Sequence, residues 1–171
     1  MKSPDTPETG SDSGTGTLRI WHPGYWIATW FGAGNLPIAP GTWGSAVAAI
    51  MAWPIVSIWG LPGLIAATLM LALVGTWAAG VYCAHSPESD PGPVVVDEVV
   101  GQWITLLVIP PDLLFYVIGF FLFRIADIFK PWPASWADQK VPGGLGVMLD
   151  DVFAGIYAAA VLYFLWWFFV V

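Results

Sequence analysis

The chain is 171 residues long, 57% of them hydrophobic and only 10% charged, and its formal net charge is −7. So little charge in a chain of this length argues against a soluble globular domain, and the negative balance argues against a nucleic-acid-binding protein. Several apolar runs approach or exceed the roughly 20 residues that a helix needs to cross a bilayer. The composition therefore predicts an all-α fold, a polytopic membrane helical bundle in one compact domain.

The N-terminal segment has a different character from the rest. Residues 1–17 are polar and rich in Ser, Thr, Gly and Pro. They bury too little apolar surface to become ordered, and they lack the apolar core of a signal peptide. We predict a disordered polar tail over residues 1–20 and a single membrane-embedded domain over residues 21–171. Residues 21–36 are aromatic and apolar but broken by two glycines, which indicates an interfacial or re-entrant segment.

About five spans are predicted after this segment. They are apolar runs bounded by turn-forming residues, and they cover residues 45–59, 64–83, 94–109, 113–129 and 150–171. Pro54 is expected to kink the first of them, and the third is a helix of about 24 Å. Residues 60–63 read as a tight turn, and residues 130–149, with three prolines and three glycines, read as a loop.

The positive charges predict which side of the membrane each turn faces. All five lie in the tail, at the end of the fourth span or in the loop after it, namely at Lys2, Arg19, Arg124, Lys130 and Lys140. Because Lys and Arg favour the cytoplasmic side, we expect the tail to be cytoplasmic and the C-terminus to lie outside. The same arrangement brings the acidic residues discussed below to the cytoplasmic face.

Arg124, Asp127 and Lys130 are three ionisable residues at the end of an apolar span, where such groups are costly. Their i, i+3, i+6 spacing places them on one stripe of a helix, where they can hold a phosphate and help to hold a metal ion. The alternative is structural: the cations snorkel to the membrane surface and Asp127 pairs with Arg124. Arg124 and Asp127 lie up to two turns inside the span, which favours the functional interpretation.

Two adjacent acid pairs open predicted helices. Asp97 and Glu98 begin the third span, and Asp150 and Asp151 begin the last. One acid at such a place stabilises the helix dipole or serves as an N-cap, but a second adds repulsion. With Asp127 they make five carboxylates at one face, which indicates a Mg²⁺ site, since Mg²⁺ prefers oxygen ligands. Zinc is not expected, because the chain has only two distant histidines and one cysteine.

A glycine- and hydroxyl-rich segment, residues 39–45, precedes the first span. Pro40, Gly41, Thr42 and Ser45 at a helix N-terminus can bind an anion such as a substrate phosphate. The alternative is an ordinary turn with Thr42 or Ser45 as the cap.

Four blocks together resemble the phosphatidylglycerophosphatase A family. They are FGAGNLPIAPGTWGS at residues 31–45, VDEVVGQWIT at 96–105, FRIADIFKPWP at 123–133 and GGLGVMLDDVFAG at 143–155, in the family's order. The resemblance runs from about residue 31 into the last span. It implies a membrane enzyme that uses Mg²⁺ to remove the terminal phosphate of phosphatidylglycerophosphate, giving phosphatidylglycerol. It also implies a phospholipid substrate and a bacterial cytoplasmic (inner) membrane location, with the active site facing the cytoplasm.

Carried over by motif, the catalytic residues of the family fall on the positions already singled out: Asp97, Glu98, Arg124, Asp127, Lys130, Asp150 and Asp151. Of these the carboxylates are the expected metal ligands, and Arg124 and Lys130 the expected phosphate contacts. The chain departs from the family pattern at Val96, where a Trp is expected, and at Pro142, where a His is expected. Two other functions remain open: an ion or phosphate transporter that uses the same carboxylates, and a phosphatase of another lipid-like phosphomonoester.

Overall fold

The computed structural model describes residues 18–88 and 90–170, which form helices and connecting segments without a β-strand. The all-α prediction is confirmed for this part of the chain. The predicted disordered tail lies outside the described residues except for its last three. Of these, Leu18 is buried.

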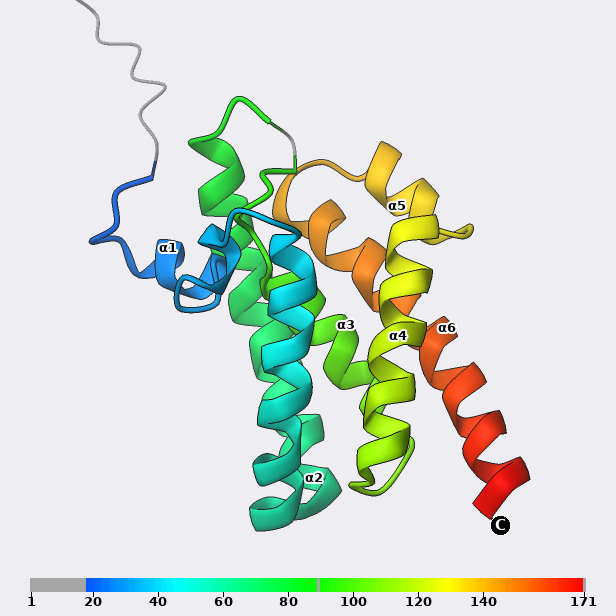
Figure 1. Ribbon diagram of the computed structural model, residues 1–171. Coiled ribbons are helices and arrows are strands. Elements are labelled where there is room, and N and C mark those ends of the chain that lie inside the picture. Colours follow the sequence, from blue (N-terminus) through cyan, green and yellow to red (C-terminus); the bar gives the residue numbers. More distant parts are fainter. Residues whose placement is uncertain (1–17, 89, 171) are drawn as a thin grey trace, which may run out of the picture.

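Helix α2 (Pro40–Ala84) is a hairpin of two arms. Its backbone leaves the helical conformation at Gly60 (φ 67°, ψ −173°), a positive φ that glycine tolerates best. Residues 40–59 run along the bundle in one direction and residues 61–84 return, with the turn at the lower end in Figure 1. The predicted turn after residue 59 is therefore confirmed. The first arm begins at Pro40 and not at residue 45, because a proline suits the first helical position.

Helix α3 (Val96–Leu106) is the centre of the bundle. It packs against α2, α4 (Leu113–Phe129) and α6 (Gly143–Val170), and nine of its eleven residues are buried. The helix is shorter than the 94–109 run predicted for it. At about 1.5 Å per residue it is also much shorter than the hydrocarbon core of a bilayer.

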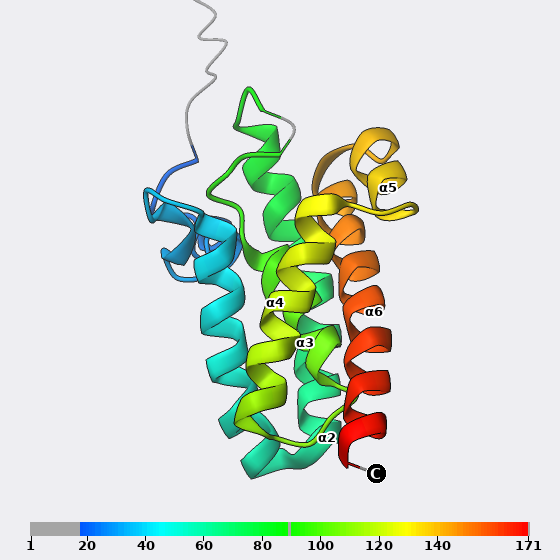
Figure 2. The same ribbon diagram turned by 45° about the vertical axis from the view of Figure 1, so that its right-hand side comes forward.

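Among the described residues, α2 and α6 are the two helices long and apolar enough to cross a membrane. Helix α4 spans residues 113–129 as predicted. Its N-terminus is capped by Asp112, whose carboxylate accepts a hydrogen bond from the Phe115 N–H at 3.0 Å. Helices α4 and α6 pack against each other, and Figure 2 shows them close together in the upper part of the bundle and further apart at its lower end.

The predicted loop over residues 130–149 is wrong. It contains α5 (Ala134–Lys140) and the first two turns of α6, which begins at Gly143. Gly144 lies against the backbone of Thr76 and Gly80 in α2, where any side chain would overlap main-chain atoms. Close packing between two helices explains a glycine that the sequence pattern assigned to a flexible loop.

The N-terminal segment forms α1 (Pro23–Ala28) and the short 3₁₀ helix η1 (Ala33–Asn35), and both pack against α2. The side chain of His22 caps α1 by accepting a hydrogen bond from the Gly24 N–H at 3.0 Å. His85 directly follows the last residue of α2 as its C-cap, with its Nδ1 2.8 Å from the Val81 carbonyl oxygen. Each histidine therefore interacts with a helix end of its own.

Candidate active site

Three carboxylates from two helices meet near one end of the bundle. Asp97 and Glu98 lie in the first turn of α3, as predicted, and Asp151 lies in the third turn of α6. One oxygen from each of the three lies within 4.8 Å of the other two. Asp97 and Asp151 are only 6% and 2% exposed, so these acids are withdrawn from bulk solvent.

The close approach of α3 to α6 brings these acids together. Gly155 lies directly on the backbone of Gly101, one helix against the other, and a Cβ there would overlap the Gly101 carbonyl. On its other side Gly101 faces Phe123 of α4 and the carbonyl oxygen of Asp151. Two facing glycines thus set a short interhelical distance one turn from the carboxylates.

The structure corrects the position of Asp150 and Asp151 within their helix. They were predicted at its start, where one of them was a possible N-cap, but the helix begins seven residues earlier. Neither residue caps the helix, so that structural explanation of the acid pair does not apply. Asp151 belongs to the trio, while Asp150 accepts a hydrogen bond from Lys130 Nζ at 2.7 Å.

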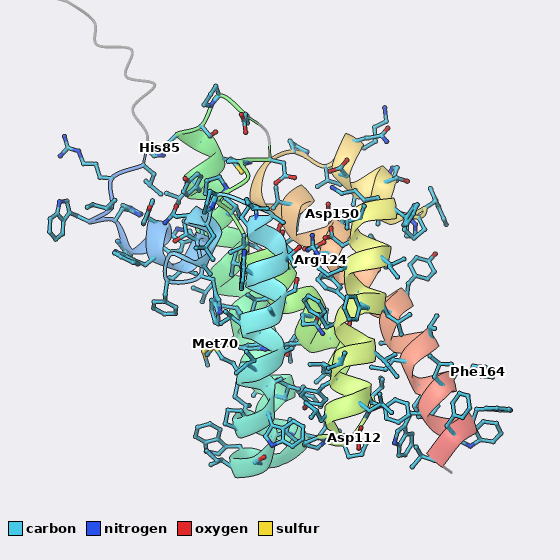
Figure 3. The ribbon with its side chains drawn as sticks, viewed as in Figure 1. Met70, His85, Asp112, Arg124, Asp150 and Phe164 are labelled. Carbon is cyan, nitrogen blue, oxygen red and sulfur yellow. The ribbon has the colours of Figure 1, made fainter. Side chains whose placement is uncertain are left out.

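Arg124 is the cation next to the trio. Its Nη1 is 2.7 Å from Asp127 Oδ2 and 3.9 Å from Glu98 Oε1, and it donates to Ser45 Oγ at 3.4 Å. The side chains of Arg124 and Asp127 are 15% and 13% exposed. The predicted pairing of Arg124 with Asp127 is present, but it is part of a network that joins α2, α3 and α4. Figure 3 places Arg124 and Asp150 toward the same end of the bundle, opposite Asp112.

Lys130 does not continue the stripe of Arg124 and Asp127. It is the C-cap of α4 with a left-handed backbone (φ 43°), and its ammonium group donates to both Asp138 and Asp150. Burial alone would lower the pKa of Lys130, but these two hydrogen bonds outweigh it and hold the pKa well above its usual value. Lys130 thus lies between two carboxylates and forms an ion pair with each.

The first turn of α2 forms one wall of the site. Gly41 lies so close to Glu98 that a Cβ would overlap its carboxylate, and Ser45 is fully buried. Ser45 Oγ donates to the Gly41 carbonyl at 2.8 Å while it accepts from Arg124. The N–H of Thr42 already donates to Ala39 O at 2.9 Å, and Pro40 has none. Phosphate binding by Pro40, Gly41, Thr42 and Ser45 stays a prediction.

Residues that the sequence did not assign complete the polar region. Asp138 on α5 shares Lys130 with Asp150, and a cavity of about 340 Å³ beside it is lined by Asp90, Lys140 and Pro142 among others. Burial raises the pKa of Asp90. Gln102 is fully buried one turn after Glu98, and its amide has no hydrogen-bond partner among the described residues. In the sequence, Gln102 follows Glu98 by four residues, a spacing that places both on one face of a helix and could have pointed to it.

The carboxylate trio fits a hard divalent cation. Its donor set is all oxygen, and Asp97 Oδ1 and Glu98 Oε2 are buried without a hydrogen-bond partner among the described residues. Unpartnered buried carboxylate oxygens are costly, and a cation at this point would satisfy them. Two further carboxylates lie beside the trio: Asp127 shares Arg124 with Glu98, and Asp150 accepts a hydrogen bond from the N–H of Asp151 at 3.0 Å.

Comparison with known proteins shows the family to which the chain belongs. Residues 26–166 match the family described as phosphatidylglycerophosphatase A. The chain belongs to that family. It is therefore an enzyme of phosphoric monoester hydrolysis, and the family assignment favours a phosphatase over the transporter considered from the sequence.

Relatives in several bacteria support the assignment. The phosphatidylglycerophosphatase A of Escherichia coli is 40% identical over 156 residues, covering 86% of each chain. That of Haemophilus influenzae is 35% identical over 147 residues, covering 85% of this chain and 90% of its own. A Bacteroides thetaiotaomicron protein with the provisional name phosphatidylinositol-3-phosphatase is 41% identical over 139 residues, covering 77% of this chain and 86% of its own. No solved structure matches the chain.

Proposed function

We propose that the protein is a Mg²⁺-dependent phosphatidylglycerophosphatase that converts phosphatidylglycerophosphate to phosphatidylglycerol in phospholipid biosynthesis. Two relatives that align over most of their length carry that enzyme's name. The observation that carries the proposal is the trio of Asp97, Glu98 and Asp151, with ligand atoms within 4.8 Å of one another beside a guanidinium group. A phosphomonoester dianion needs cations around its oxygens, and here the guanidinium of Arg124 and a Mg²⁺ held by the trio would supply them.

The charges of the site divide into paired and unpaired groups. Asp127 is paired with Arg124 at 2.7 Å and Asp150 with Lys130 at 2.7 Å, whereas the trio has, among the described residues, one longer contact with a cation, 3.9 Å between Arg124 and Glu98. We assign the trio as Mg²⁺ ligands, with Asp127 and Asp150 beside them. A bound Mg²⁺ supplies the positive charge that neutralises the phosphoryl oxygens.

Arg124 is the residue that binds the phosphate in this proposal. Its guanidinium carries donors on one plane, and its Nε is buried without a partner among the described residues. Asp127 and Ser45 both contact its Nη1 and hold that end of the group in place. Gly41 leaves room between the first turn of α2 and Glu98 for this network to close.

We propose water as the nucleophile. Asp127 and Asp150 are paired with Arg124 and Lys130, and the other three carboxylates are assigned here as metal ligands. Water forms the new bond to phosphorus, the bond between phosphorus and the glycerol oxygen breaks, and that oxygen leaves with a proton. The products are inorganic phosphate and phosphatidylglycerol. Acid quenching during turnover of ³²P-labelled substrate tests this step, and label retained on the protein would indicate an aspartyl-phosphate intermediate instead.

The membrane arrangement belongs to the same proposal. The two arms of α2, with α3, α4 and α6, form about five membrane-embedded segments, of which α3 is the enclosed one. Lys130 and Lys140 lie at the end of the bundle that holds the carboxylates, which supports a cytoplasmic active site. The relatives are bacterial, and we place the enzyme in the inner membrane.

Phosphate release by the purified protein in detergent tests the proposal. The substrates are phosphatidylglycerophosphate, phosphatidic acid and phosphatidylinositol 3-phosphate, each with Mg²⁺ and with a chelator. We expect Mg²⁺-dependent release from the first at a kcat/KM well above the others. Preferred hydrolysis of the inositol lipid would instead favour the activity for which the Bacteroides relative is named. Equal rates with the chelator would remove the metal from the proposal.

A further inference from the structure

A second cavity lies below the active site and is almost wholly apolar. It has a volume of about 540 Å³ and lies between the first arm of α2 and α4. Its lining residues are Ala46, Ala49, Ile50, Trp53, Pro54, Leu113, Tyr116, Val117 and Phe120. Neither the family assignment nor the carboxylate network gives this cavity a function.

The walls of the cavity are the two helices that carry active-site residues. On α2, Ala46 directly follows Ser45, and Ala49 lies one turn further from the site. On α4, Phe120 and Val117 lie about one and two turns below Arg124. Because Arg124 donates to Ser45, the cavity starts within one turn of the point where the two helices join at the site.

The residues that line the cavity follow one another along the two helix axes, and we describe the cavity as the α2–α4 groove. From Ala46 to Pro54 it follows α2 for about 12 Å at 1.5 Å per residue. Two of its lining residues on α2 are alanines, and its aromatic lining residues are Trp53, Tyr116 and Phe120. The rings of Trp53 and Tyr116 meet with their centroids 5.3 Å apart. An apolar groove that extends lengthwise from a phosphate-binding site matches a linear hydrocarbon attached to a phosphorylated headgroup.

We propose that this groove binds one acyl chain of the phospholipid substrate while the headgroup occupies the carboxylate site. The inference rests on the proposed function, because it takes the substrate to be a lipid phosphomonoester. It goes further by assigning the α2–α4 groove as the site of chain recognition. The enzyme then selects its substrate by chain length as well as by headgroup.

Filling the groove tests the proposal. Ala49→Leu and Ala46→Leu place extra methyl groups in the groove, whereas Ala66→Leu makes the same change on an exposed position of the second arm of α2. KM and kcat are measured in the same micelles for phosphatidylglycerophosphate with two sixteen-carbon chains and with two six-carbon chains. The purified full chain is used throughout.

We expect wild type to prefer the long-chain substrate, and Ala49→Leu to raise its KM about tenfold, the effect of losing about two methylene groups from an apolar contact. The KM for the short-chain substrate and both constants of Ala66→Leu should not change. Phe120→Ala provides a second variant with the opposite effect, since it widens the groove and should favour a chain with a bulky substituent. The comparison of Phe120→Ala with wild type tests chain binding in the groove even if Ala49→Leu folds poorly.

Three outcomes would overturn the inference. An equal rise in the KM of Ala49→Leu for both chain lengths would indicate that the groove holds a lipid other than the substrate, or that the substitution damages the site in general. An altered oligomeric state with an unchanged chain-length profile would assign the groove to a second copy of the protein. Equal KM values of wild type for both chain lengths would exclude chain recognition while leaving the proposed function intact. Failure of wild type to hydrolyse either substrate would instead refute the proposed function.

Discussion

Replacing Gly41 by alanine should inactivate the enzyme without unfolding it. The added methyl group would overlap Glu98 Oε1, and it would lie 2.9 Å from Glu98 Cδ and 3.1 Å from Arg124 Nη1. Ordinary contacts between carbon atoms begin at about 3.5 Å. The Glu98 carboxylate must therefore move by about 1 Å, since the backbone of α2 is held by packing and the end of the glutamate side chain is the more flexible of the two groups in contact.

The expected loss follows from the role of Glu98. Misplacing a group of a catalytic constellation by about 1 Å costs on the order of 100-fold in rate. Stability should rise or stay the same. Alanine in place of a helical glycine stabilises by roughly 0.5–1 kcal/mol, which offsets the cost of moving one side chain. Loss of activity at unchanged or raised Tm separates misplacement from unfolding.

The assay is phosphate release at a series of Mg²⁺ concentrations, with thermal unfolding in the same detergent. Gly92→Ala is the matched control, because a Cβ at Gly92 meets no atom within 4 Å. We expect Gly92→Ala to match wild type and Gly41→Ala to need more Mg²⁺ and to turn over about 100-fold more slowly. A Gly41→Ala enzyme with wild-type kcat and Mg²⁺ dependence would show that the position of the Glu98 carboxylate has no part in catalysis.

Four further changes test other parts of the site and its setting. Asp151→Asn should lower kcat by about 100-fold or more, as expected for a lost electrostatic contact in the transition state, and should weaken Mg²⁺ binding measured by titration. Arg124→Lys keeps the charge but loses the planar fork, so kcat/KM should fall about tenfold to 100-fold at unchanged Tm. Lys130→Met removes the cation that pairs with Asp138 and Asp150 and should lower stability by about 1–3 kcal/mol in thermal unfolding, whereas Lys130→Arg should restore most of it. Reporter fusions at Met1 and Val171 should report opposite sides of the membrane.

Each of these has an outcome that contradicts it. Unchanged Mg²⁺ affinity in Asp151→Asn would remove that residue from the metal site. An Arg124→Lys enzyme with full kcat/KM would exclude bidentate phosphate binding. Equal stability of Lys130→Met and wild type would mean that its two hydrogen bonds contribute nothing net. Both termini on one side would change the number of spans and separate the charged end from the cytoplasm.

Much of the architecture could be predicted because apolar runs and helix-breaking residues coincide. Helix α4 begins where the pattern predicted because Asp112 caps its N-terminus, and it ends where predicted because the backbone of Lys130 leaves the helical conformation. The hairpin turn at Gly60 was visible for the same reason. The start of α6 was not, since three glycines and a proline read locally as a loop, and only contact with α2 explains the helix there.

The residues of the candidate site could be singled out from the sequence, but the partners of their side chains could not. The cost of charge in an apolar chain identified Asp97, Glu98, Arg124 and Asp151, and the structure brings them together. Helical periodicity wrongly grouped Lys130 with Arg124, because periodicity assumes that the helix continues. A backbone at φ 43° sends the Lys130 side chain instead to α5 and α6.

The two departures from the family pattern affect different things. Val96 is fully buried, against Gly75 and Met148, so the change there is one of packing in the core behind the site. Pro142 lines the polar cavity beside Asp138, so its presence removes an imidazole from the edge of the site. His22 and His85 do not replace it, since each is engaged at a helix end of its own. In the proposed reaction the leaving glycerol oxygen therefore takes its proton from water or from a carboxyl group of the cluster. This is consistent with a site in which acids outnumber cations.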